Sequence, residues 1–249
     1  MFDLKGKTAL ITGASSGLGA HFALVLASAG ADVILAARRV DSLTEVARTT
    51  SRRCCVKVET LRLDVTSLAS LKSASYAIAE IDILVNNAGI VHNAAALDQS
   101  EESWDAVVNT NLKGAFLVAQ ATAKCMSAAK RRGSIINVAS ILGLRQSGAV
   151  LPYAVSKAGL IQMTKILALD LARFEIRVNA LAPGYFDTDL NRDFWQTEAG
   201  KALIRRVPQR RLGRLGDLDG PLLLLASDAS RFMTGSAIAV DGGHLVSSL

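Results

Sequence analysis

Short apolar runs alternate along the chain with longer segments of helical periodicity. Seven of these runs have the length and composition of strands: residues 7–12, 32–37, 56–63, 81–86, 134–139, 177–181 and 237–240. Most are continuously apolar, which is typical of a parallel sheet covered by helices on both faces. The alternation therefore predicts an α/β fold with a doubly wound parallel sheet of about seven strands.

The segments between these runs carry apolar residues at helical spacing. One such face follows Gly17 and consists of Leu18, Phe22, Val25, Leu26 and Ala29. Gly30 then follows as a helix-ending glycine. The longest helical stretches are 102–129 and 153–174, and no repeat or linker interrupts the pattern. We therefore expect one Rossmann-like domain over residues 1–249.

One segment, residues 187–214, departs from this regular alternation. It is far longer than the usual αβ connection of about 2–6 residues, and long insertions in compact domains are usually functional. It also carries Phe194 and Trp195, which are large apolar groups. We predict a mobile lid that closes over a substrate. The alternative is a permanently packed helical insertion.

Composition narrows the class of protein further. Half of the 249 residues are hydrophobic and 20% are charged, which excludes intrinsic disorder. No apolar run reaches the roughly 18 residues that cross a membrane. The first seven residues are polar and lead directly into a strand, so they do not resemble a signal peptide. We expect a cytoplasmic protein without a membrane partner.

Neither the charged residues nor the potential metal ligands are concentrated in one part of the sequence. Lys and Arg number 28 against 22 Asp and Glu, and the tracts 130–132, 205–206 and 210–214 suit an anionic substrate, carrier or cofactor. No basic stripe alternates with aromatic residues, so no nucleic-acid partner is expected. Cys54, Cys55 and Cys125 form no CxxC motif, which fits a reducing compartment. The three histidines are scattered, so we expect no metal.

A glycine-rich segment lies between the first strand and the first helix. Gly13 permits the turn, Gly17 lets the backbone approach a diphosphate, and Gly19 permits close helix packing. The free amides of a helix N-terminus then favour an anion. Ser15, Ser16 and Leu18 complete this candidate diphosphate loop.

The spacing TGx3GxG resembles that of the short-chain dehydrogenase/reductase family, and the resemblance continues along almost the whole chain. The other matching motifs are Leu63-Asp64-Val65, Asn86-Asn87-Ala88-Gly89, Asn111, Ser140, Tyr153-Ala154-Val155-Ser156-Lys157, Pro183-Gly184 and Asp241-Gly242-Gly243. Their common order makes chance negligible. The family resemblance implies a nicotinamide cofactor and hydride transfer.

The end of the second strand bears on which nicotinamide cofactor is used. A dinucleotide fold that prefers NAD usually carries an acid there, for the ribose hydroxyls. This chain has Arg38 and Arg39 instead, and a guanidinium can bind a 2′-phosphate bidentately. The sequence favours NADP(H), with Arg38 as the principal contact. The alternative is a pair of solvated loop arginines.

The resemblance assigns further cofactor contacts. It implies that Asp64 accepts from the adenine amino group, although a turn-capping role is also open, and that Val65 lines the adenine pocket. The strand-end residues Asn87, Ala88 and Gly89 are expected beside the ribose. After the sixth strand, the resemblance implies that Pro183, Gly184, Phe186 and Thr188 hold the carboxamide and the pyrophosphate.

Tyr153 and Lys157 are four residues apart and so share one helix face. A neighbouring ammonium, together with an oxidised nicotinamide, lowers the pKa of a phenol and makes it a proton donor and acceptor. Ser140, at the end of the fifth strand, is placed to orient a substrate oxygen. By resemblance, Lys157 also binds the nicotinamide ribose, and Asn111 holds a water that links Lys157 to solvent.

The sequence thus predicts an NADP(H)-dependent oxidoreductase acting on a ketone or secondary alcohol. A narrower alternative, suggested by the resemblance, is a 3-oxoacyl-[acyl-carrier-protein] or acyl-CoA reductase. Arg131 lies where the carrier-protein reductases have a basic contact for their acidic carrier. Their second arginine for carrier docking would fall at Phe174 here, with Arg173 displaced by one residue, and this departure weakens that alternative. A catalytically silent NADP-sensing regulator is the alternative from another class.

The substrate itself is less readable than the reaction. Candidate substrate contacts are Ser140, Leu142, Tyr153, Tyr185 and Trp195. The residues Leu142, Leu144, Leu151, Phe194 and Trp195 suggest an apolar pocket, or else they pack the lid.

The resemblance implies a homotetramer that pairs the two long helices. A face of small residues supports close helix approach, although a face buried within one chain has the same pattern: Ala115, Val118, Ala119, Thr122 and Ala123.

Overall fold

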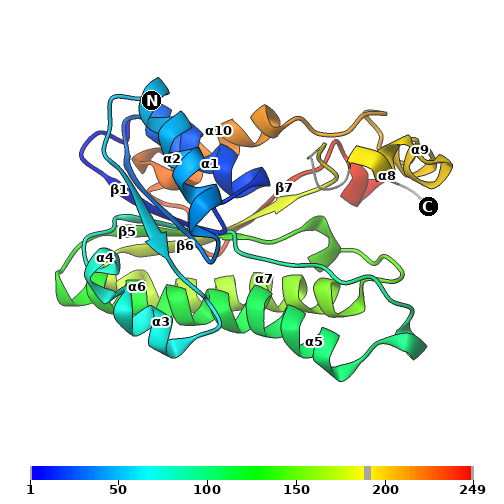
Figure 1. Ribbon diagram of the computed structural model, residues 1–249, viewed down its shortest axis with the longest axis horizontal. Coiled ribbons are helices and arrows are strands. Elements are labelled where there is room, and N and C mark those ends of the chain that lie inside the picture. Colours follow the sequence, from blue (N-terminus) through cyan, green and yellow to red (C-terminus); the bar gives the residue numbers. More distant parts are fainter. Residues whose placement is uncertain (1, 188–191, 248–249) are drawn as a thin grey trace.

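The computed structural model describes residues 2–187 and 192–247, which form one seven-stranded sheet with helices on both faces (Figure 1). The strands are β1 (Thr8–Thr12), β2 (Asp32–Ala37), β3 (Val58–Arg62), β4 (Ile83–Asn86), β5 (Gly133–Val138), β6 (Ile176–Pro183) and β7 (Ala237–Val240). They pair in parallel in the order β3-β2-β1-β4-β5-β6-β7. The predicted doubly wound parallel sheet is confirmed, with each strand within two residues of its predicted bounds.

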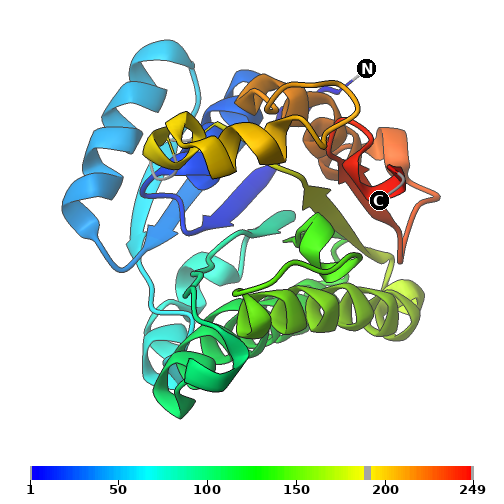
Figure 2. The ribbon, with the colours of Figure 1, turned by 90° about the vertical axis from the view of Figure 1, so that its right-hand side faces the viewer.

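Helices form a layer on each side of the sheet. They are α1 (Gly17–Ser28), α2 (Val40–Arg53), α3 (Leu68–Ser73), α4 (Ser75–Ile78), α5 (Glu101–Val108), α6 (Ala115–Ala128), α7 (Leu151–Leu171), α8 (Arg192–Gln196), α9 (Glu198–Ile204) and α10 (Asp219–Ala226). Helices α1, α2 and α10 cover one face, and α3 to α7 cover the other (Figures 1 and 2). Among the described helices, none is long and apolar enough to cross a membrane.

Alternation along the strands explains why both faces are apolar. Successive side chains of a strand point to opposite faces. Ile11 therefore packs with Phe22 of α1 and Leu222 of α10 on one side of the sheet. Its neighbour Leu10 packs with Val118 of α6 on the other side. A strand with apolar residues at every position thus has both of its faces buried, as its continuous apolar run predicts.

The stretch 102–129, predicted as one helix, is helical throughout but not uniform. Between α5 and α6 it contains a π-helical segment, η2 (Asn109–Gly114). Single π turns inside α-helices are frequent at functional sites. Asn111 lies in the middle of η2 and is buried. The segment therefore marks this part of the helix as more than a packing element.

The order of the strands creates a crevice at one edge of the sheet. The chain winds from β1 outward to β3, and then restarts at β4 on the other side of β1. Loops that follow β1 and β4 consequently run in opposite directions, and ligands of doubly wound sheets bind between them. The same edge receives the ends of β2, β5 and β6, because all strands are parallel.

The predicted insertion, residues 187–214, contains the short helices α8 and α9. Its two ends are tied together, because Asp187 N donates to Gly213 O at 3.1 Å and Gly213 N donates to Tyr185 O at 2.9 Å. The ring of Phe186 lies against Gly213, where a Cβ would come within 2.5 Å of a ring carbon. The two ends of the insertion are therefore fixed side by side. We call residues 187–214 the lid segment.

Candidate active site

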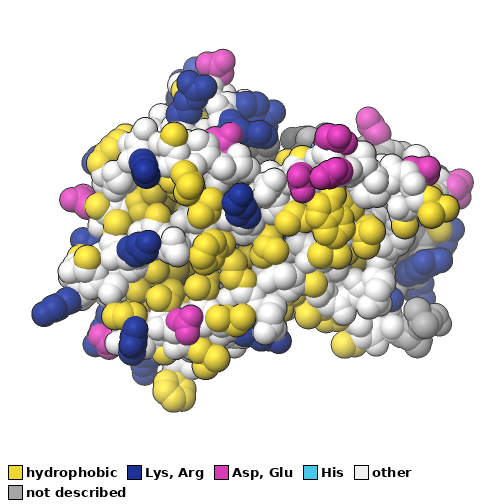
Figure 3. All heavy atoms as spheres, turned by 90° about the horizontal axis from the view of Figure 1, so that it is seen from below, with side chains coloured by type: hydrophobic (Ala, Val, Ile, Leu, Met, Phe, Trp, Pro, Cys, Tyr) yellow, Lys and Arg dark blue, Asp and Glu magenta, His cyan; other side chains and the backbone are white. Residues whose placement is uncertain are grey.

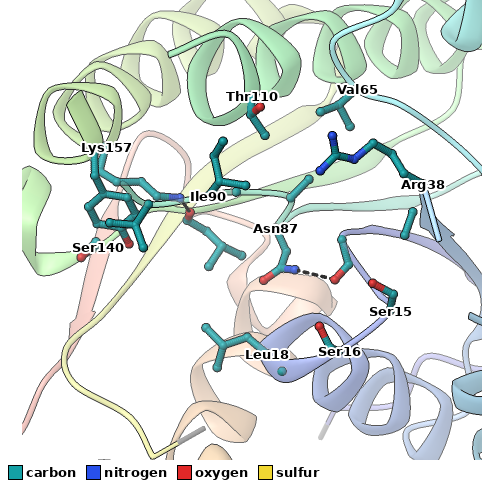
Figure 4. Close-up of a pocket in the computed structure, with 18 of the residues that line it drawn as sticks. Ser15, Ser16, Leu18, Arg38, Val65, Asn87, Ile90, Thr110, Ser140 and Lys157 are labelled. Carbon is teal, nitrogen blue, oxygen red and sulfur yellow. Dashed lines mark hydrogen bonds between the residues drawn. The ribbon is translucent and has the colours of Figure 1, made fainter. Parts of the chain in front are cut away.

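A cleft of about 900 Å³ opens at the carboxyl edge of the sheet (Figure 4). It is lined by most of the residues that the sequence singled out: Gly13, Ser15, Ser16, Gly17, Leu18, Arg38, Arg39, Asp64, Val65, Asn87, Ala88, Gly89, Ser140, Tyr153, Lys157, Pro183, Gly184 and Phe186. Of the predicted cofactor contacts, Gly19 packs behind the cleft, and Thr188 lies outside the described residues.

The glycine-rich loop has the geometry that a diphosphate needs. Gly13 and Gly17 adopt the left-handed region, with φ of +67° and +56°. A Cβ on Gly13 would approach Ala88 Cα to 2.8 Å, and one on Gly19 would approach Gly13 O to 2.3 Å, so both glycines serve close packing. At Gly17 no atom lies within 4 Å of the Cβ position, which leaves the backbone open to a ligand at the start of α1.

A hydrogen-bonded clasp fixes this loop to the end of β4. The Thr12 hydroxyl accepts from the amides of Asn87 at 3.0 Å and Ala88 at 3.1 Å. In return, Asn87 Nδ2 donates to Thr12 O at 3.0 Å and Gly13 O at 3.2 Å (Figure 4). Thr12 is the first residue of the TGx3GxG motif but was not among the predicted site residues. Its position before Gly13, at the end of an apolar strand, was the available signal.

The end of β2 places its two arginines differently. Arg38 extends over the cleft between Val65 and Ser15 (Figure 4). Arg39 turns toward the glycine-rich loop, where Nη2 donates to Ser15 Oγ at 3.3 Å and to Ser16 Oγ at 3.5 Å. Both guanidinium groups thus face the part of the cleft where an adenosine phosphate would lie.

Asp64, which follows the neighbouring strand β3, caps its own turn. Its Oδ1 accepts from Thr66 Oγ1 at 2.7 Å and from Thr66 N at 2.9 Å. These hydrogen bonds, supported by the charge of Arg38, hold the pKa of Asp64 below its usual value. The turn-capping alternative is therefore confirmed. The carboxylate also lines the cleft, so the implied contact to adenine stays a prediction.

The opposite end of the cleft brings Ser140, Tyr153 and Lys157 together (Figure 4). Both Tyr153 and Lys157 belong to α7, and Lys157 Nζ lies 5.6 Å from the centroid of the Tyr153 ring. Lys157 is only 4% exposed, and Nζ donates to Val138 O at 2.7 Å. The ammonium is thereby held between the end of β5 and the phenol.

Burial governs the protonation of this pair. It lowers the pKa of Lys157 to about 8. It also raises the pKa of Tyr153, an effect that a hydrogen bond with Ser140 opposes and that the nearby Tyr185 reinforces. The protein's own groups therefore do not produce the lowered phenol pKa that the sequence predicts. The physical reason is that two groups removed from water both favour their neutral forms.

Asn111 is hydrogen-bonded to the backbone of Ile90. Its Oδ1 accepts from Ile90 N at 2.8 Å, and its Nδ2 donates to Ile90 O at 2.9 Å and to Ser156 Oγ at 3.1 Å. A Cβ on Gly89 would lie 3.3 Å from Asn111 Oδ1 and 3.6 Å from Lys157 Nζ, so the two side chains meet beside that glycine. Asn111 itself does not line the cleft, whereas its neighbour Thr110 does.

The predicted substrate contacts divide into two groups. Ser140 and Tyr153 line the cleft, whereas Leu142, Tyr185 and Trp195 do not. Leu142 N donates to Ser140 Oγ at 3.1 Å, which holds the serine at the strand end.

The proposed apolar pocket does not form along the cleft. Trp195 is buried against Tyr185, with ring centroids 5.5 Å apart. Leu144, Leu151 and Phe194 are largely exposed. For Trp195, packing of the lid segment is thus the correct alternative.

Some lining residues were missed by sequence reasoning. They are Thr66, Ile90, Val91, Thr110, Val138 and Ala139. Most of them directly follow or precede a motif, and that adjacency was the only signal. Within residues 2–187 and 192–247, no three His, Cys, Asp or Glu side chains are grouped to hold a metal ion.

A dinucleotide fits the chemistry of this cleft. Its loop after β1 offers backbone amides, its edge at β2 offers guanidinium groups, and its far end holds a serine, a phenol and an ammonium. A cleft with these groups is typical of a nicotinamide-dependent oxidoreductase, in which the cofactor carries the hydride.

Comparison with known proteins agrees. A family model described as Enoyl-(Acyl carrier protein) reductase matches residues 13–244. The chain is 40% identical to the 3-oxoacyl-[acyl-carrier-protein] reductase FabG of Thermotoga maritima, over 98% of this chain and 99% of that one. It is 39% identical to the 2-dehydro-3-deoxy-D-gluconate 5-dehydrogenase of Escherichia coli, over 98% and 97% of the two chains.

A solved structure gives the same result. The gluconate 5-dehydrogenase of Burkholderia cenocepacia, described in complex with NADP and tartrate, superposes with a TM-score of 0.94 at 36% identity, over 99% of this chain and 98% of that one. The chain belongs to the short-chain dehydrogenase/reductase family and is an oxidoreductase.

Proposed function

We propose that this protein transfers hydride between NADP(H) and a ketone or secondary alcohol. The observation that carries the proposal is one continuous cleft with Arg38 at one end and Ser140, Tyr153 and Lys157 at the other. No acid stands at the end of β2, where Arg38 and Arg39 follow Ala37. The solved gluconate 5-dehydrogenase of similar sequence, described with NADP, supports the choice of cofactor.

The chain's own residues have separate roles in this reaction. NADP(H), when bound, supplies or accepts the hydride. Ser140 orients and polarises the substrate oxygen, and Tyr153 transfers the proton to or from it. A protonated Lys157 stabilises the phenolate form of Tyr153. Asn111 fixes the Ile90 backbone beside Lys157 and, by family resemblance, continues the proton relay toward solvent through a water.

A panel of ketones and alcohols tests this proposal. NADPH oxidation with ketones, and NADP reduction with alcohols, are followed spectrophotometrically, each in parallel with NADH and NAD. We expect turnover of at least one ketone with NADPH. Tight NADPH binding without any turnover across the panel would instead indicate the alternative of an NADP-sensing regulator.

Substitution of Arg38 tests the choice of cofactor. A hydrogen bond to a charged group is worth about 1.5–3 kcal/mol, or roughly 10- to 100-fold in affinity. Because Arg38 is exposed, we expect Arg38→Ala to weaken NADPH binding by a factor near the lower end of that range. NADH lacks the phosphate and serves as the control, so its affinity should change little. Equal losses for both cofactors, measured by fluorescence titration, would contradict the assignment.

A 3-oxoacyl thioester carried by acyl carrier protein or coenzyme A is a second candidate substrate. The relative from Thermotoga maritima is named for that reaction. Arg131 is half-buried, and its Nη1 donates to Ala79 O at 3.3 Å. At the second docking position, however, Arg173 lies over the ring of Phe174 at 4.7 Å. Both thioesters therefore belong in the substrate panel.

We propose that the lid segment opens and closes over the substrate. Its base is fixed by the hydrogen bonds between Tyr185, Asp187 and Gly213, so α8 and α9 can move as one unit. Large apolar groups such as Trp195 then exclude water from hydride transfer. We expect amide hydrogen exchange in α8 and α9 to slow when NADP(H) and substrate are added. Full protection without ligands, unchanged by adding them, would show the permanently packed alternative.

We also propose that the protein is a homotetramer. The small-residue face of α6 is buried inside the chain, packed with β1 and β4, so it does not form the contact. Apolar side chains instead remain exposed over the lower helical layer (Figure 3), among them Phe116, Leu151, Val155, Ile166 and Leu169 on α6 and α7. Light scattering at micromolar concentration should give four times the 26.3 kDa chain mass, and a monomer would refute the proposal.

A further inference from the structure

Three buried polar side chains form a series of hydrogen bonds behind the cleft. Asn86 and Asn137 are register partners on β4 and β5, and Thr164 lies on α7. None of them is more than 3% exposed, and none lines the cleft. Asn86 Nδ2 donates to Asn137 Oδ1 at 3.0 Å, and Asn137 Nδ2 donates to Thr164 Oγ1 at 2.9 Å. We call Asn86, Asn137 and Thr164 the buried network.

Both ends of the buried network are tied to helices. Thr164 Oγ1 donates its proton to Leu160 O at 2.8 Å, one turn earlier in α7, so only its lone pairs are open to Asn137. At the other end, Asn86 Nδ2 also donates to Ala115 O at 3.0 Å, at the start of α6. Each hydrogen bond therefore has a fixed direction, and the network joins β4, β5, α6 and α7.

Stability alone does not account for the buried network. Asn86 Oδ1 is buried and has no hydrogen-bond partner among the described residues. An incompletely satisfied buried network is less favourable than an apolar core. The strand neighbours Val85, Ile136 and Val138 are indeed apolar and pack into the core on the opposite face of the sheet. Hydrogen bonds, unlike apolar contacts, fix both distance and direction, which indicates a role in positioning.

The buried network lies next to the contact that holds Lys157. Asn137 directly precedes Val138, whose carbonyl oxygen accepts from Lys157 Nζ at 2.7 Å. Lys157 and Thr164 are seven residues apart, so they lie on the same face of α7 and about 10 Å apart along its axis. Adjacent residues of β5 thus bond to α7 at two points along its length. Two such points fix the helix along its axis, which a single contact through a flexible lysine does not.

The buried network also reaches the other elements that build the site. Asn86 directly precedes residues 87–89, which line the cleft. Ala115 directly follows η2, the segment that contains Asn111. A change in the network therefore acts on the framework of the site without touching the place of the cofactor or of the substrate.

We propose that Asn137 and Thr164 are positioning residues for Lys157. The buried network fixes α7 lengthwise against β5, so that Lys157 Nζ stays bonded to Val138 O beside the Tyr153 phenol. A small displacement of a reacting group lowers a rate by a large factor, because the group must be held in one geometry. The inference rests on the proposed function, since it explains how the proton-transferring pair of that reaction is held in place.

Substitution of Thr164 tests the inference, because its hydroxyl can be removed with little change in side-chain volume. Thr164→Val takes away the acceptor of Asn137 Nδ2. We expect kcat with NADPH and the best ketone of the panel to fall at least about 10-fold. KM for the ketone and affinity for NADPH should change little, since the lost contact serves the reaction step. The solvent deuterium isotope effect on kcat should rise, because proton transfer through Tyr153 becomes the slower step.

Two matched variants separate positioning from packing. Thr164→Ser keeps the hydroxyl but loses a methyl group, and should retain most of the native kcat. Thr122 in α6 is fully buried, and its hydroxyl has no hydrogen-bond partner among the described residues. Thr122→Val therefore makes the same chemical change without breaking a hydrogen bond, and should leave kcat and the isotope effect unchanged. Thermal unfolding verifies that each variant is folded at the assay temperature.

The outcomes separate this inference from the proposed function. If Thr164→Val has the kcat of Thr122→Val, or if Thr164→Ser loses as much activity as Thr164→Val, the positioning role is wrong, although the proposed reaction stands. If the native protein reduces no ketone, the proposed function fails, and amide hydrogen exchange over residues 151–160 decides. Exchange that is faster in Thr164→Val than in Thr164→Ser and the native protein would still support the fixing of α7. Equal exchange in all three would reject it.

Discussion

Tyr153→Phe is expected to abolish turnover while leaving cofactor binding intact. Proton transfer by a positioned side chain contributes about 10²–10⁴-fold to a rate, and phenylalanine cannot transfer a proton. The ring remains, so its packing beside Lys157 Nζ, 5.6 Å from the centroid, is preserved. We expect kcat to fall at least about 100-fold, measured with the best ketone of the panel. Affinity for NADPH, from fluorescence titration, should change by less than about twofold.

A distant tyrosine provides the matched control for this variant. Tyr76 in α4 is 71% exposed and lies outside the cleft. Tyr76→Phe makes the same chemical change and should leave kcat and cofactor affinity unchanged. Near-native kcat in Tyr153→Phe would show that Tyr153 is not the proton donor. A simultaneous loss of NADPH binding would indicate damage to the cleft rather than to the chemistry.

The fold was predictable because each strand is apolar along its whole length. Leu10 and Ile11 are adjacent and face opposite helical layers, so the continuous run in 7–12 already implies two covered faces. The glycine-rich loop was predictable for a related reason. At Gly13 and Gly19 a Cβ would overlap backbone atoms, and such local constraints leave a mark in the sequence itself.

Contacts between distant segments left no comparable mark. Thr12 and Asn87 are 75 residues apart, and their mutual hydrogen bonds depend on β1 and β4 being neighbours in the sheet. The π-helical segment around Asn111 was equally hidden. Its sequence is compatible with an ordinary α-helix. The π-helical turn is accompanied by hydrogen bonds between the Asn111 side chain and the backbone of Ile90, which lies outside the helix. Only the assembled sheet reveals why either residue matters.

The substrate end was the least predictable part of the site. Trp195 was singled out in the segment 187–214, but the choice between pocket and packing depends on Tyr185 in the loop after β6. The low pKa of Lys157 was hidden for the same reason. A helical spacing of four residues places Lys157 near Tyr153. Burial beside the end of β5 is what makes the charged form of Lys157 unfavourable, and the sequence does not show that burial.

The burial of the Lys157 ammonium lowers the stability of the folded protein, although the proposed reaction needs this residue. Burial lowers its pKa from 10.5 to about 8, so below pH 8 the folded protein carries a charge that is more stable in water. At about 1.36 kcal/mol for each pKa unit, the destabilisation is about 3 kcal/mol at neutral pH. Lys157→Met removes the charge but also the hydrogen bond from the ammonium to Val138 O, which is worth about 1.5–3 kcal/mol because its donor is charged. We therefore expect the variant to be about 1 kcal/mol more stable than the native protein at pH 7, and inactive.

The difference should change with pH in a defined direction. Between pH 8 and pH 10.5 the unfolded chain retains the Lys157 proton that the folded chain has lost, so the native protein gains stability as pH rises. Lys157→Met lacks this gain, and its advantage should shrink through the same window until the lost hydrogen bond dominates. Urea unfolding of both proteins at pH 7 and pH 10 measures the change, because effects of other groups cancel in the comparison. An equal difference at the two pH values would mean that Lys157 is not held in the folded protein as a desolvated ammonium.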